Sequence, residues 1–450
     1  MKTRNLALVT LAIISIGSQA SAAGNKKAAV SNTRTAEWTM LTYIAADNSL
    51  APYATYNMND MAAGIASTNN VNILVQWDKP SDNKSWRYKI TPGGKIESGS
   101  VSSEMGYDPA KELVASMQWA KKSFPAKRYA LILWDHGSGV EDFEPGVARN
   151  IALNPRLYTS WLQLPGYAPA KGRGILYDDT QSTCLTNQGL TTALGQIKTL
   201  LGKKIDIVAT DACLMAMVEV AYQMKDLVTY FVGSEQTIPG YGYPYSKFIR
   251  PLSQNPAGTS ALQLAQAMVN SYQQYYTTQE PTPDRTLSTI DVTSIGLIKQ
   301  NIDQFIAAVN ACAQLDAEAT KSMIVAARQG ASSFAMDEYI DLYSFYAGIL
   351  GRMKKTSPKS HAILAQRQKA GARSEPSRAY QDALATLDSV IQDGITKITT
   401  VVVHNAVGPV YAGCKGISIY YPDSGPIHSS YSRTLFAQDT AWTNFVLQYR

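Results

Sequence analysis

Two apolar runs in this 450-residue chain end in side chains that together can do nucleophilic chemistry. The run "RYALILWDHGSG" ends at Asp135 and continues with His136-Gly137, and the run "IDIVATDAC" ends at Asp211 and continues to Cys213. A thiol can attack a carbonyl carbon, and a nearby imidazole can take the thiol proton and later protonate a leaving amine. The pair therefore indicates acyl transfer, provided that the fold brings the two segments together.

The surrounding pattern predicts elements that would do so. Five continuous apolar, β-branched runs alternate with helix-like segments, which favours an α/β fold with a mainly parallel sheet. The runs end at Asp47, Asp78, Asp135, Asp211 and near Glu235, and the helix-like segments between them include 109–122, 186–201 and 214–225. In such sheets, ligands bind outside the carboxyl ends of the strands. If the strands before His136 and Cys213 are parallel neighbours, the two side chains lie at the same edge.

The segment after Cys213 predicts how its thiol is activated. Residues 214–224 contain no glycine or proline and are apolar nearly all round, which predicts a buried helix that begins directly after Cys213. The positive end of a helix macrodipole lowers the pKa of a thiol. The backbone N–H groups of Gly137 and Cys213 are candidate donors to a developing oxyanion.

Other readings of these residues stay open at this point. A single cysteine in apolar surroundings is more often a small core residue, and a single histidine after a strand is more often structural. Cys312 and Cys414 could form a disulfide in the C-terminal half, whereas Cys184 lies in a polar stretch and could be free. No Cys or His pair has zinc-like spacing, so no metal site is predicted from spacing.

The N-terminus predicts export. Lys2 and Arg4 precede an apolar run at 6–16, and Ala20-Ser21-Ala22 supplies the small residues that signal peptidase needs. We therefore expect a signal peptide at 1–22 and a flexible lead or pro-segment at 23–36. No later segment has the length of a membrane span. The formal net charge of +6 is small for this length and does not favour nucleic acid as a partner.

Composition divides the rest of the chain into two regions. Residues 37–254 carry the strand-and-helix alternation, a "TPGG" hairpin between short β-like runs, and a long loop at 140–174 that is rich in Pro, Gly and Tyr. Residues 255–450 are mostly helical in pattern. The segments with a helical pattern are 261–277, 294–311, 316–328, 337–350 and 378–395, and strand-like runs follow within 398–422.

With these segments in place, the sequence resembles the clostripain family of cysteine peptidases, which belong to the caspase-like (caspase-hemoglobinase) fold group. The resemblance covers most of the chain after residue 37. The segments that carry it, in chain order, are "WTMLTYIAADNSL", "FPAKRYALILWDHGSGV", "IDIVATDACLMAMVEVAYQM", "VGSEQTIPGYGYPY", "EYIDLYSFY" and "GISIYYP". It implies a caspase-like, mainly parallel sheet flanked by helices, with a mostly helical C-terminal region that carries additional strands.

The resemblance also implies an endopeptidase that cleaves after Arg or Lys. Cys213 matches the family's nucleophile and His136 its catalytic histidine, while Asp211, Ser234 and Glu235 become the candidate substrate-binding residues. A carboxylate at Asp211 would pair with a basic side chain, and the alternative role for Asp211 is the N-cap of the following helix. The segment 239–243 lacks the further acidic residue that family members often carry, so lysine or a broader basic preference stays open.

Two further properties follow from the resemblance alone. Family members can be activated by cleavage between the histidine and cysteine segments, where Arg149, Arg156, Lys171 and Arg173 lie in the loop 140–174. Some members depend on calcium, for which Asp178 and Asp179 are among the available acids, although no EF-hand loop is present. Two alternatives to a peptidase remain: an inactive homologue that serves as a binding module, and an amidase or transpeptidase with the same dyad. The sequence predicts protein or peptide substrates and gives no oligomeric state.

Overall fold

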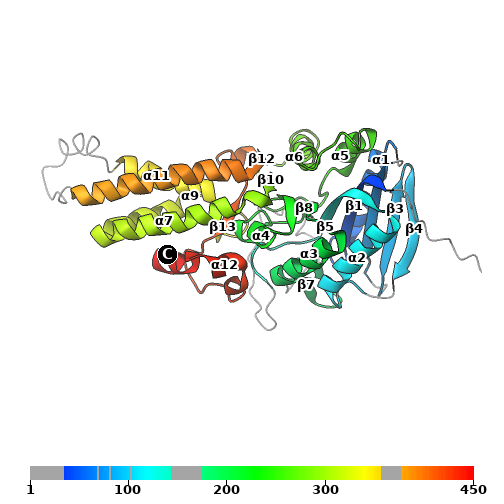
Figure 1. The fold of residues 1–450 in the computed structure, drawn as a ribbon, viewed down its shortest axis with the longest axis horizontal. Coiled ribbons are helices and arrows are strands. Elements are labelled where there is room, and N and C mark those ends of the chain that lie inside the picture. Colours follow the sequence, from blue (N-terminus) through cyan, green and yellow to red (C-terminus); the bar gives the residue numbers. More distant parts are fainter. Residues whose placement is uncertain (1–34, 68–69, 81–82, 102–103, 143–173, 356–376) are drawn as a thin grey trace, which may run out of the picture.

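A nine-stranded sheet forms the centre of the molecule (Figure 1). The computed structural model describes residues 35–67, 70–80, 83–101, 104–142, 174–355 and 377–450. The strands lie in the order β12 (Val402–Val407), β10 (Thr286–Asp291), β9 (Val228–Gly233), β8 (Ile205–Asp211), β5 (Ala126–Trp134), β1 (Ala36–Ala45), β2 (Val71–Asp78), β3 (Ser85–Thr91) and β4 (Gly94–Val101).

The middle of the sheet is parallel and its two margins are antiparallel. Strands β2, β1, β5, β8 and β9 pair in parallel, and each is one of the apolar runs predicted from the sequence. The predicted hairpin forms β3 and β4 at one margin. At the other margin, β10 and β12 come after residue 255 in the chain yet pair with β9 and with each other. The boundary predicted between 254 and 255 therefore does not separate two sheets.

Helices cover both faces of the sheet because successive strand residues point to opposite sides. In β5, Ile132 packs into a core with α1 (Ala51–Gly64), α5 (Tyr245–Gln254) and α6 (Ala261–Thr278). The neighbouring Leu131 and Leu133 pack into a core on the opposite face, with α2 (Pro109–Ser123), α3 (Asn187–Leu201) and α4 (Val218–Gln223). Figure 1 shows these two helical layers on either side of the strands.

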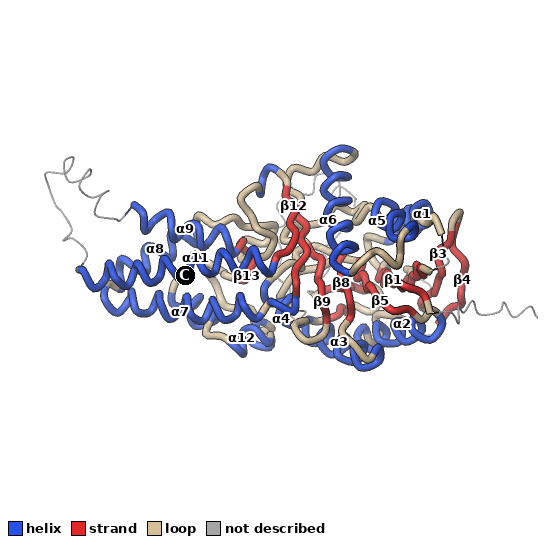
Figure 2. The backbone as a smooth tube through the Cα atoms, turned by 45° about the horizontal axis from the view of Figure 1, so that its top comes forward, coloured by secondary structure: helices blue, strands red, loops and turns tan. Residues whose placement is uncertain are grey.

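The C-terminal helices extend the molecule beyond the β12 margin. Helices α7 (Gly296–Leu315), α8 (Ala317–Gln329), α9 (Leu342–Lys355) and α11 (Arg378–Val401) lie side by side (Figures 1 and 2). Two expectations in this region were wrong in part. Residues 339–341 form strand β11 rather than helix, and residues 398–401 are the last turn of α11 rather than the start of a strand. The short helices α12 (Leu435–Asp439) and α13 (Trp442–Gln448) end the chain.

A small second sheet connects the C-terminal half to the central sheet. Strand β11 (Tyr339–Asp341) pairs with β13 (Ser418–Tyr420), and Ser418 also forms a parallel bridge with Met217, four residues after Cys213. A third pair, β6 (Ile175–Asp178) and β7 (Thr183–Leu185), lies between β5 and α3 in the chain. These two small sheets lie at the carboxyl-terminal edge of the central sheet, where Asp135 and Asp211 are found.

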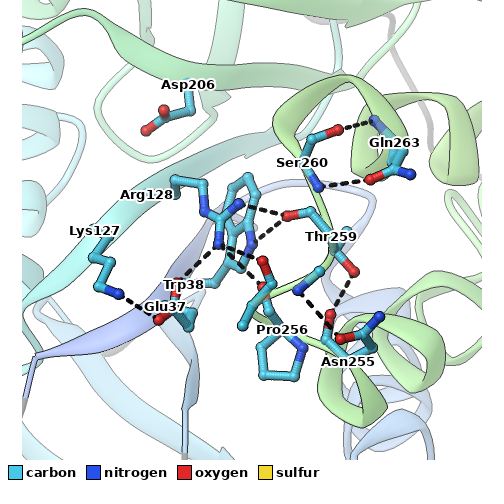
Figure 3. A network of polar contacts seen from close by, with 12 residues as sticks. Glu37, Trp38, Lys127, Arg128, Asp206, Asn255, Pro256, Thr259, Ser260 and Gln263 are labelled. Carbon is cyan, nitrogen blue, oxygen red and sulfur yellow. Dashed lines mark hydrogen bonds and ion pairs between the residues drawn. The ribbon is translucent and has the colours of Figure 1, made fainter.

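The amino ends of β1 and β5 are fastened to the α5–α6 connection (Figure 3). The Arg128 guanidinium donates to the carbonyls of Thr259 (2.8 Å) and Pro256 (3.2 Å) and pairs with Glu37 at 2.9 Å. The Trp38 indole donates to the same Thr259 carbonyl at 3.1 Å. These contacts hold the start of β1, near which the described residues begin, against the α5–α6 connection.

None of the four cysteines is joined in a disulfide, so the pairing considered between Cys312 and Cys414 is absent. Within the described residues, no helix combines the length and apolar character needed to cross a bilayer. The predicted signal peptide, the segment 23–34 and most of the loop 140–174 lie outside the described residues.

Candidate active site

Two neighbouring parallel strands deliver His136 and Cys213 to the same edge of the sheet. Trp134, the last residue of β5, is in register with Asp211, the last residue of β8. The segments stay in contact beyond the strands, since a Cβ atom placed on Gly137 would lie 2.6 Å from the Cys213 carbonyl oxygen. The expected meeting of the histidine and cysteine segments is therefore present, and only a glycine fits at position 137.

The Cys213 thiol contacts a backbone amide of the segment that follows β9. Its Sγ accepts a hydrogen bond from the Ile238 N–H at 3.3 Å. Burial, the larger effect, raises the pKa of the Cys213 thiol to about 11, against the partly opposing hydrogen bond from Ile238.

The helix predicted directly after Cys213 is absent from this position. Leu214 adopts a left-handed conformation (φ 66°), and α4 begins only at Val218. The amides of Leu214 and Ala216 donate instead to the carbonyls of Gln236 and Ser234, just after β9. The prediction that a helix N-terminus lowers the thiol pKa was wrong, because pairing with the next strand end takes the place of the first helical turn.

His136 is oriented by a residue from the segment after β1. Its Nε2 lies 3.0 Å from Ser49 Oγ, and the Tyr177 ring meets the imidazole edge-on at 6.0 Å between centroids. Burial lowers the pKa of His136 to about 4. At neutral pH the resting site thus pairs a thiol with a neutral imidazole. Sequence analysis missed Ser49, which lies in a polar "DNS" turn with no signal beyond its strand-end position.

Asn48 fixes the backbone on which His136 sits. Its Nδ2 donates to Asp135 Oδ1 and to the Tyr177 carbonyl, both at 2.8 Å, and to the Ala45 carbonyl at 3.1 Å. One side chain therefore joins the ends of β1 and β5 to the segment that precedes Asp178.

Gly137 lies beside the Cys213 backbone and takes part in a bridge with β6. It forms an isolated bridge with Ile175 that uses the amides of Ser138 and Leu176. The Gly137 N–H itself has no acceptor among the described residues. An unpaired N–H beside the Cys213 backbone is what the oxyanion of an acyl-transfer reaction requires.

Asp211 holds the segment that follows β9. We call residues 236–245 the strap. Asp211 Oδ2 accepts hydrogen bonds from the Tyr243 N–H (3.0 Å) and the Tyr245 hydroxyl (2.8 Å). Burial raises the pKa of Asp211 to about 7, although both hydrogen bonds favour the carboxylate. The alternative N-cap role was wrong, because α4 starts seven residues later and Met217 is its cap.

The strap approaches Asp211 closely. Gly242 has φ 64°, and a Cβ atom placed there would lie 2.5 Å from Asp211 Oδ2. Its carbonyl accepts from the Tyr276 hydroxyl at 2.8 Å, and the Tyr241 carbonyl accepts from Asn57 at 2.9 Å. The same strap carries Ile238, so one segment contacts both Cys213 and Asp211.

Ser234 and Glu235 face the protein interior. Ser234 Oγ lies 2.8 Å from Thr286 Oγ1, and Glu235 is 1% exposed beside Asp341. Burial raises the pKa of Glu235 well above its usual range. In this structure neither side chain is open to a substrate, because β10 and the β11–β13 pair cover them.

A group of acids near this edge could hold a metal ion. One carboxylate oxygen from each of Asp47, Glu104 and Asp178 lies within 4.8 Å of the others, and all three residues are buried. Asp178 is one of the acids anticipated for calcium, whereas its neighbour Asp179 is exposed.

A thiol and an imidazole at adjacent strand ends of a helix-covered, mainly parallel sheet define the caspase-like class of cysteine peptidase site. The model of the clostripain family matches residues 42–155 and 160–449. The chain belongs to the clostripain family.

Known relatives agree with this membership. Clostripain of Hathewaya histolytica is 27% identical in an alignment of 241 residues that covers 46% of this chain and 41% of the relative. The match thus spans about two fifths of that relative's length.

Solved structures share the fold. A secreted C11 cysteine protease from Bacteroides thetaiotaomicron aligns with a TM-score of 0.61 at 14% identity, over 90% of this chain and 99% of that one. An inactive zymogen C11 protease from Parabacteroides distasonis aligns with a TM-score of 0.56 at 17% identity, over 91% and 99% of the two chains. A B. thetaiotaomicron C11 protease in complex with an irreversible peptide inhibitor gives 0.55 at 20% identity, over the same shares of the two chains.

Proposed function

We propose that this protein is an exported cysteine endopeptidase in which Cys213 is the nucleophile and His136 the general base and acid. The observation that carries the proposal is the contact between the two strand ends, with Gly137 packed on the Cys213 carbonyl. The family membership and the secreted proteases of the same fold support it.

Because Cys213 rests as a thiol and His136 as a neutral imidazole, the thiol proton moves to His136 only during the attack on the substrate. As Sγ attacks the scissile carbonyl carbon, the thiol proton passes to His136 and the carbonyl oxygen becomes an oxyanion facing the amides of Gly137 and Cys213. Collapse breaks the C–N bond, and His136 protonates the departing amine. Water, deprotonated by His136, then hydrolyses the thioester and regenerates the thiol.

We infer a preference for Lys or Arg before the scissile bond, with Asp211 supplying the negative charge. The position of Asp211 supports this preference. Asp211 ends β8, two residues before Cys213, and the strap that covers it also donates a backbone hydrogen bond to the thiol. Ser234 and Glu235 are left out of this proposal because Ser234 is engaged by Thr286 of β10 and Glu235 lies beside Asp341 of β11.

The test is turnover of fluorogenic peptides that carry Arg, Lys, Asn or Asp before the scissile bond. Cys213→Ala and His136→Ala should each lower kcat by at least about a thousandfold while the protein stays folded. Unchanged turnover in either variant would contradict the dyad. Equal turnover of the Asp and Lys peptides would contradict the basic preference while leaving the dyad intact.

We also infer that the chain cuts itself within 140–174, where four basic residues lie between the histidine and cysteine segments. Wild-type protein should then yield two fragments by denaturing electrophoresis, and Cys213→Ala should remain one chain. A fully active protein that stays uncut would exclude this step.

A further inference from the structure

The residues after His136 pair with the start of β6, and this pairing orients the Gly137 amide. The Leu176 N–H donates to the His136 carbonyl at 3.4 Å, and the Ser138 N–H donates to the Gly174 carbonyl at 2.9 Å. In antiparallel pairing, the residue between two such bonds turns its own N–H away from the partner strand. The Gly137 N–H therefore points away from β6, which leaves it available to the proposed oxyanion.

Three consecutive peptide groups, from His136 to Gly139, are each held by a hydrogen bond. Backbone groups of the β6 segment hold the first two. A side chain from the C-terminal half of the protein holds the third, since the Tyr339 hydroxyl donates to the Ser138 carbonyl at 2.6 Å. Of these three contacts, the one from Tyr339 is therefore the contact that a single substitution can remove without changing the backbone.

The Tyr339 ring packs against both β13 and Gly139. Tyr339 is fully buried, and its ring meets the Tyr420 ring in a T-shaped contact with 6.1 Å between centroids. Gly139 has φ 67°, and a Cβ atom placed there would lie 2.7 Å from Tyr339 Cε2. The small β11–β13 sheet thus holds the Tyr339 hydroxyl in a fixed position beside the segment that follows His136.

A second tyrosine hydroxyl contacts the side chain of the same serine. Ser138 Oγ accepts from the Tyr177 hydroxyl at 3.0 Å and donates to the Glu141 carbonyl at 3.0 Å. The Tyr177 ring also meets the His136 imidazole edge-on. Tyr177 therefore connects the imidazole to the residue whose carbonyl Tyr339 holds.

We propose that Tyr177 and Tyr339 are positioning residues, whose hydroxyls hold Ser138 so that the Gly137 N–H faces the oxyanion. Tyr339 acts on the Ser138 carbonyl and Tyr177 on its Oγ. Misplacing a catalytic group by about 1 Å can cost about a hundredfold in rate, so the orientation of this amide matters to turnover. The inference rests on the proposed function, in which Gly137 supplies an oxyanion donor.

Kinetics of tyrosine-to-phenylalanine variants test the proposal, because this change removes a hydroxyl and keeps the ring. In Tyr339→Phe, kcat for a lysine peptide should fall at least about tenfold while KM stays within about twofold, since the oxyanion forms only after attack. Tyr177→Phe keeps the ring contact with His136 and should lower kcat at least about threefold.

Tyr421→Phe is the matched control. The buried Tyr421 hydroxyl also donates to a backbone carbonyl, that of Tyr449, at 2.9 Å. Its loss should lower the Tm about as much as Tyr339→Phe does and leave kcat unchanged. Equal losses of kcat in Tyr339→Phe and Tyr421→Phe would overturn the proposal.

Two measurements separate the orientation of the amide from general damage to the site. Iodoacetamide alkylates Cys213 without forming an oxyanion, so Tyr339→Phe should be alkylated at the wild-type rate at each pH. A peptide aldehyde adds to the thiol, forming a C–S bond and placing its oxygen where the oxyanion forms, so its affinity should fall by about the factor lost from kcat/KM. The peptide alcohol of the same sequence cannot add to the thiol and should bind unchanged. Alkylation that slows as much as turnover, or equal losses of affinity for the aldehyde and the alcohol, would overturn the proposal.

The orientation of the amide can also be measured without turnover. Of the four histidines, only His136 precedes a glycine, so ¹³C-carbonyl histidine combined with ¹⁵N glycine selects the NMR signal of the Gly137 amide. In Cys213→Ala protein, this signal should shift when Tyr339→Phe is added and stay in place when Tyr421→Phe is added. An unmoved signal in the Tyr339→Phe protein would overturn the positioning role even if the enzyme is active. A shifted signal, in a protein whose wild type cleaves no peptide, would instead reject the proposed peptidase and leave the contact in place.

Discussion

At the scale of single residues, the proposed dyad consists of a thiol and an imidazole that are both uncharged at rest. Cys213 is hydrogen-bonded to Ile238 and His136 to Ser49, and burial moves the two pKa values apart, to about 11 and about 4. In the proposed mechanism, the thiol proton therefore moves during attack on a bound substrate.

The first prediction concerns this resting state. At pH 7 a thiol with a pKa of about 11 is ionised in about one molecule in ten thousand. Alkylation of Cys213 by iodoacetamide should therefore be slow at pH 7 and accelerate about tenfold per pH unit up to at least pH 9. Site-resolved mass spectrometry measures the rate, and a plateau below pH 7 would instead show a preformed thiolate–imidazolium pair.

The second prediction concerns Gly137. Gly137→Ala puts a methyl group against the Cys213 carbonyl, so the donor N–H moves and kcat should fall by at least about a hundredfold. Gly195→Ala, in α3, is the control, because a Cβ there meets nothing within 4 Å; it should keep full activity. Equal activity of the two variants would show that position 137 has no special role.

At the scale of elements, the strap contacts both Asp211, the proposed specificity residue, and Cys213, the proposed nucleophile. It follows β9, donates to Asp211 from Tyr243 and Tyr245, and donates to the thiol from Ile238. Any change that loosens its hold on Asp211 should therefore be visible in substrate selection.

Tyr245→Phe tests this role. Loss of the hydroxyl removes a donor that favours the carboxylate, so the pKa of Asp211 should rise above about 7. Fewer molecules then carry the charge at pH 7, and kcat/KM for lysine peptides should fall about threefold to tenfold and recover at higher pH. Tyr272→Phe removes a buried hydroxyl that has no partner among the described residues, and its profile should stay unchanged. Matching profiles for the two variants would argue against a charged Asp211 in recognition.

Much of this arrangement could be predicted from the sequence, and the failures have physical causes. The five parallel strands and the meeting of His136 with Cys213 follow from apolar runs that end in polar residues. The helix after Cys213 was wrong because the composition of 214–217 suits a helix, while the carbonyls of Ser234 and Gln236, distant in sequence, bind its amides. Local sequence patterns could not predict the contacts of Ser49 and Ile238 or the grouping of Asp47, Glu104 and Asp178. These depend on how separate loops approach one another in the fold.

At the scale of the whole molecule, buried acids make stability depend on pH. Burial raises the pKa of Glu219 to about 7 and of Asp341 to about 6. These groups keep protons in the folded state that the unfolded chain has released by about pH 5, so the unfolded state binds fewer protons in this window. Stability should fall as pH rises from about 5 to about 7.

Glu219→Gln measures the contribution of Glu219 to this pH dependence of stability. Gln retains an oxygen for the Tyr420 N–H and the Tyr431 hydroxyl, both 3.0 Å from Glu219 Oε1. Chemical denaturation in EDTA should show a loss of stability between pH 5 and pH 8 that is smaller in the variant than in wild type, by up to about 3 kcal/mol. Equal losses would show that Glu219 stays ionised throughout.

The strands β10 and β12 limit where the chain can be truncated, because they complete the central sheet beside β9. A fragment that stops at residue 254 would leave β9 as a bare margin, with Phe231 and Val232 stripped of cover and a row of backbone groups open to pairing. Such a fragment would recruit copies of itself and precipitate during expression. The residues that carry the proposed dyad should therefore be expressed together with the chain through β12.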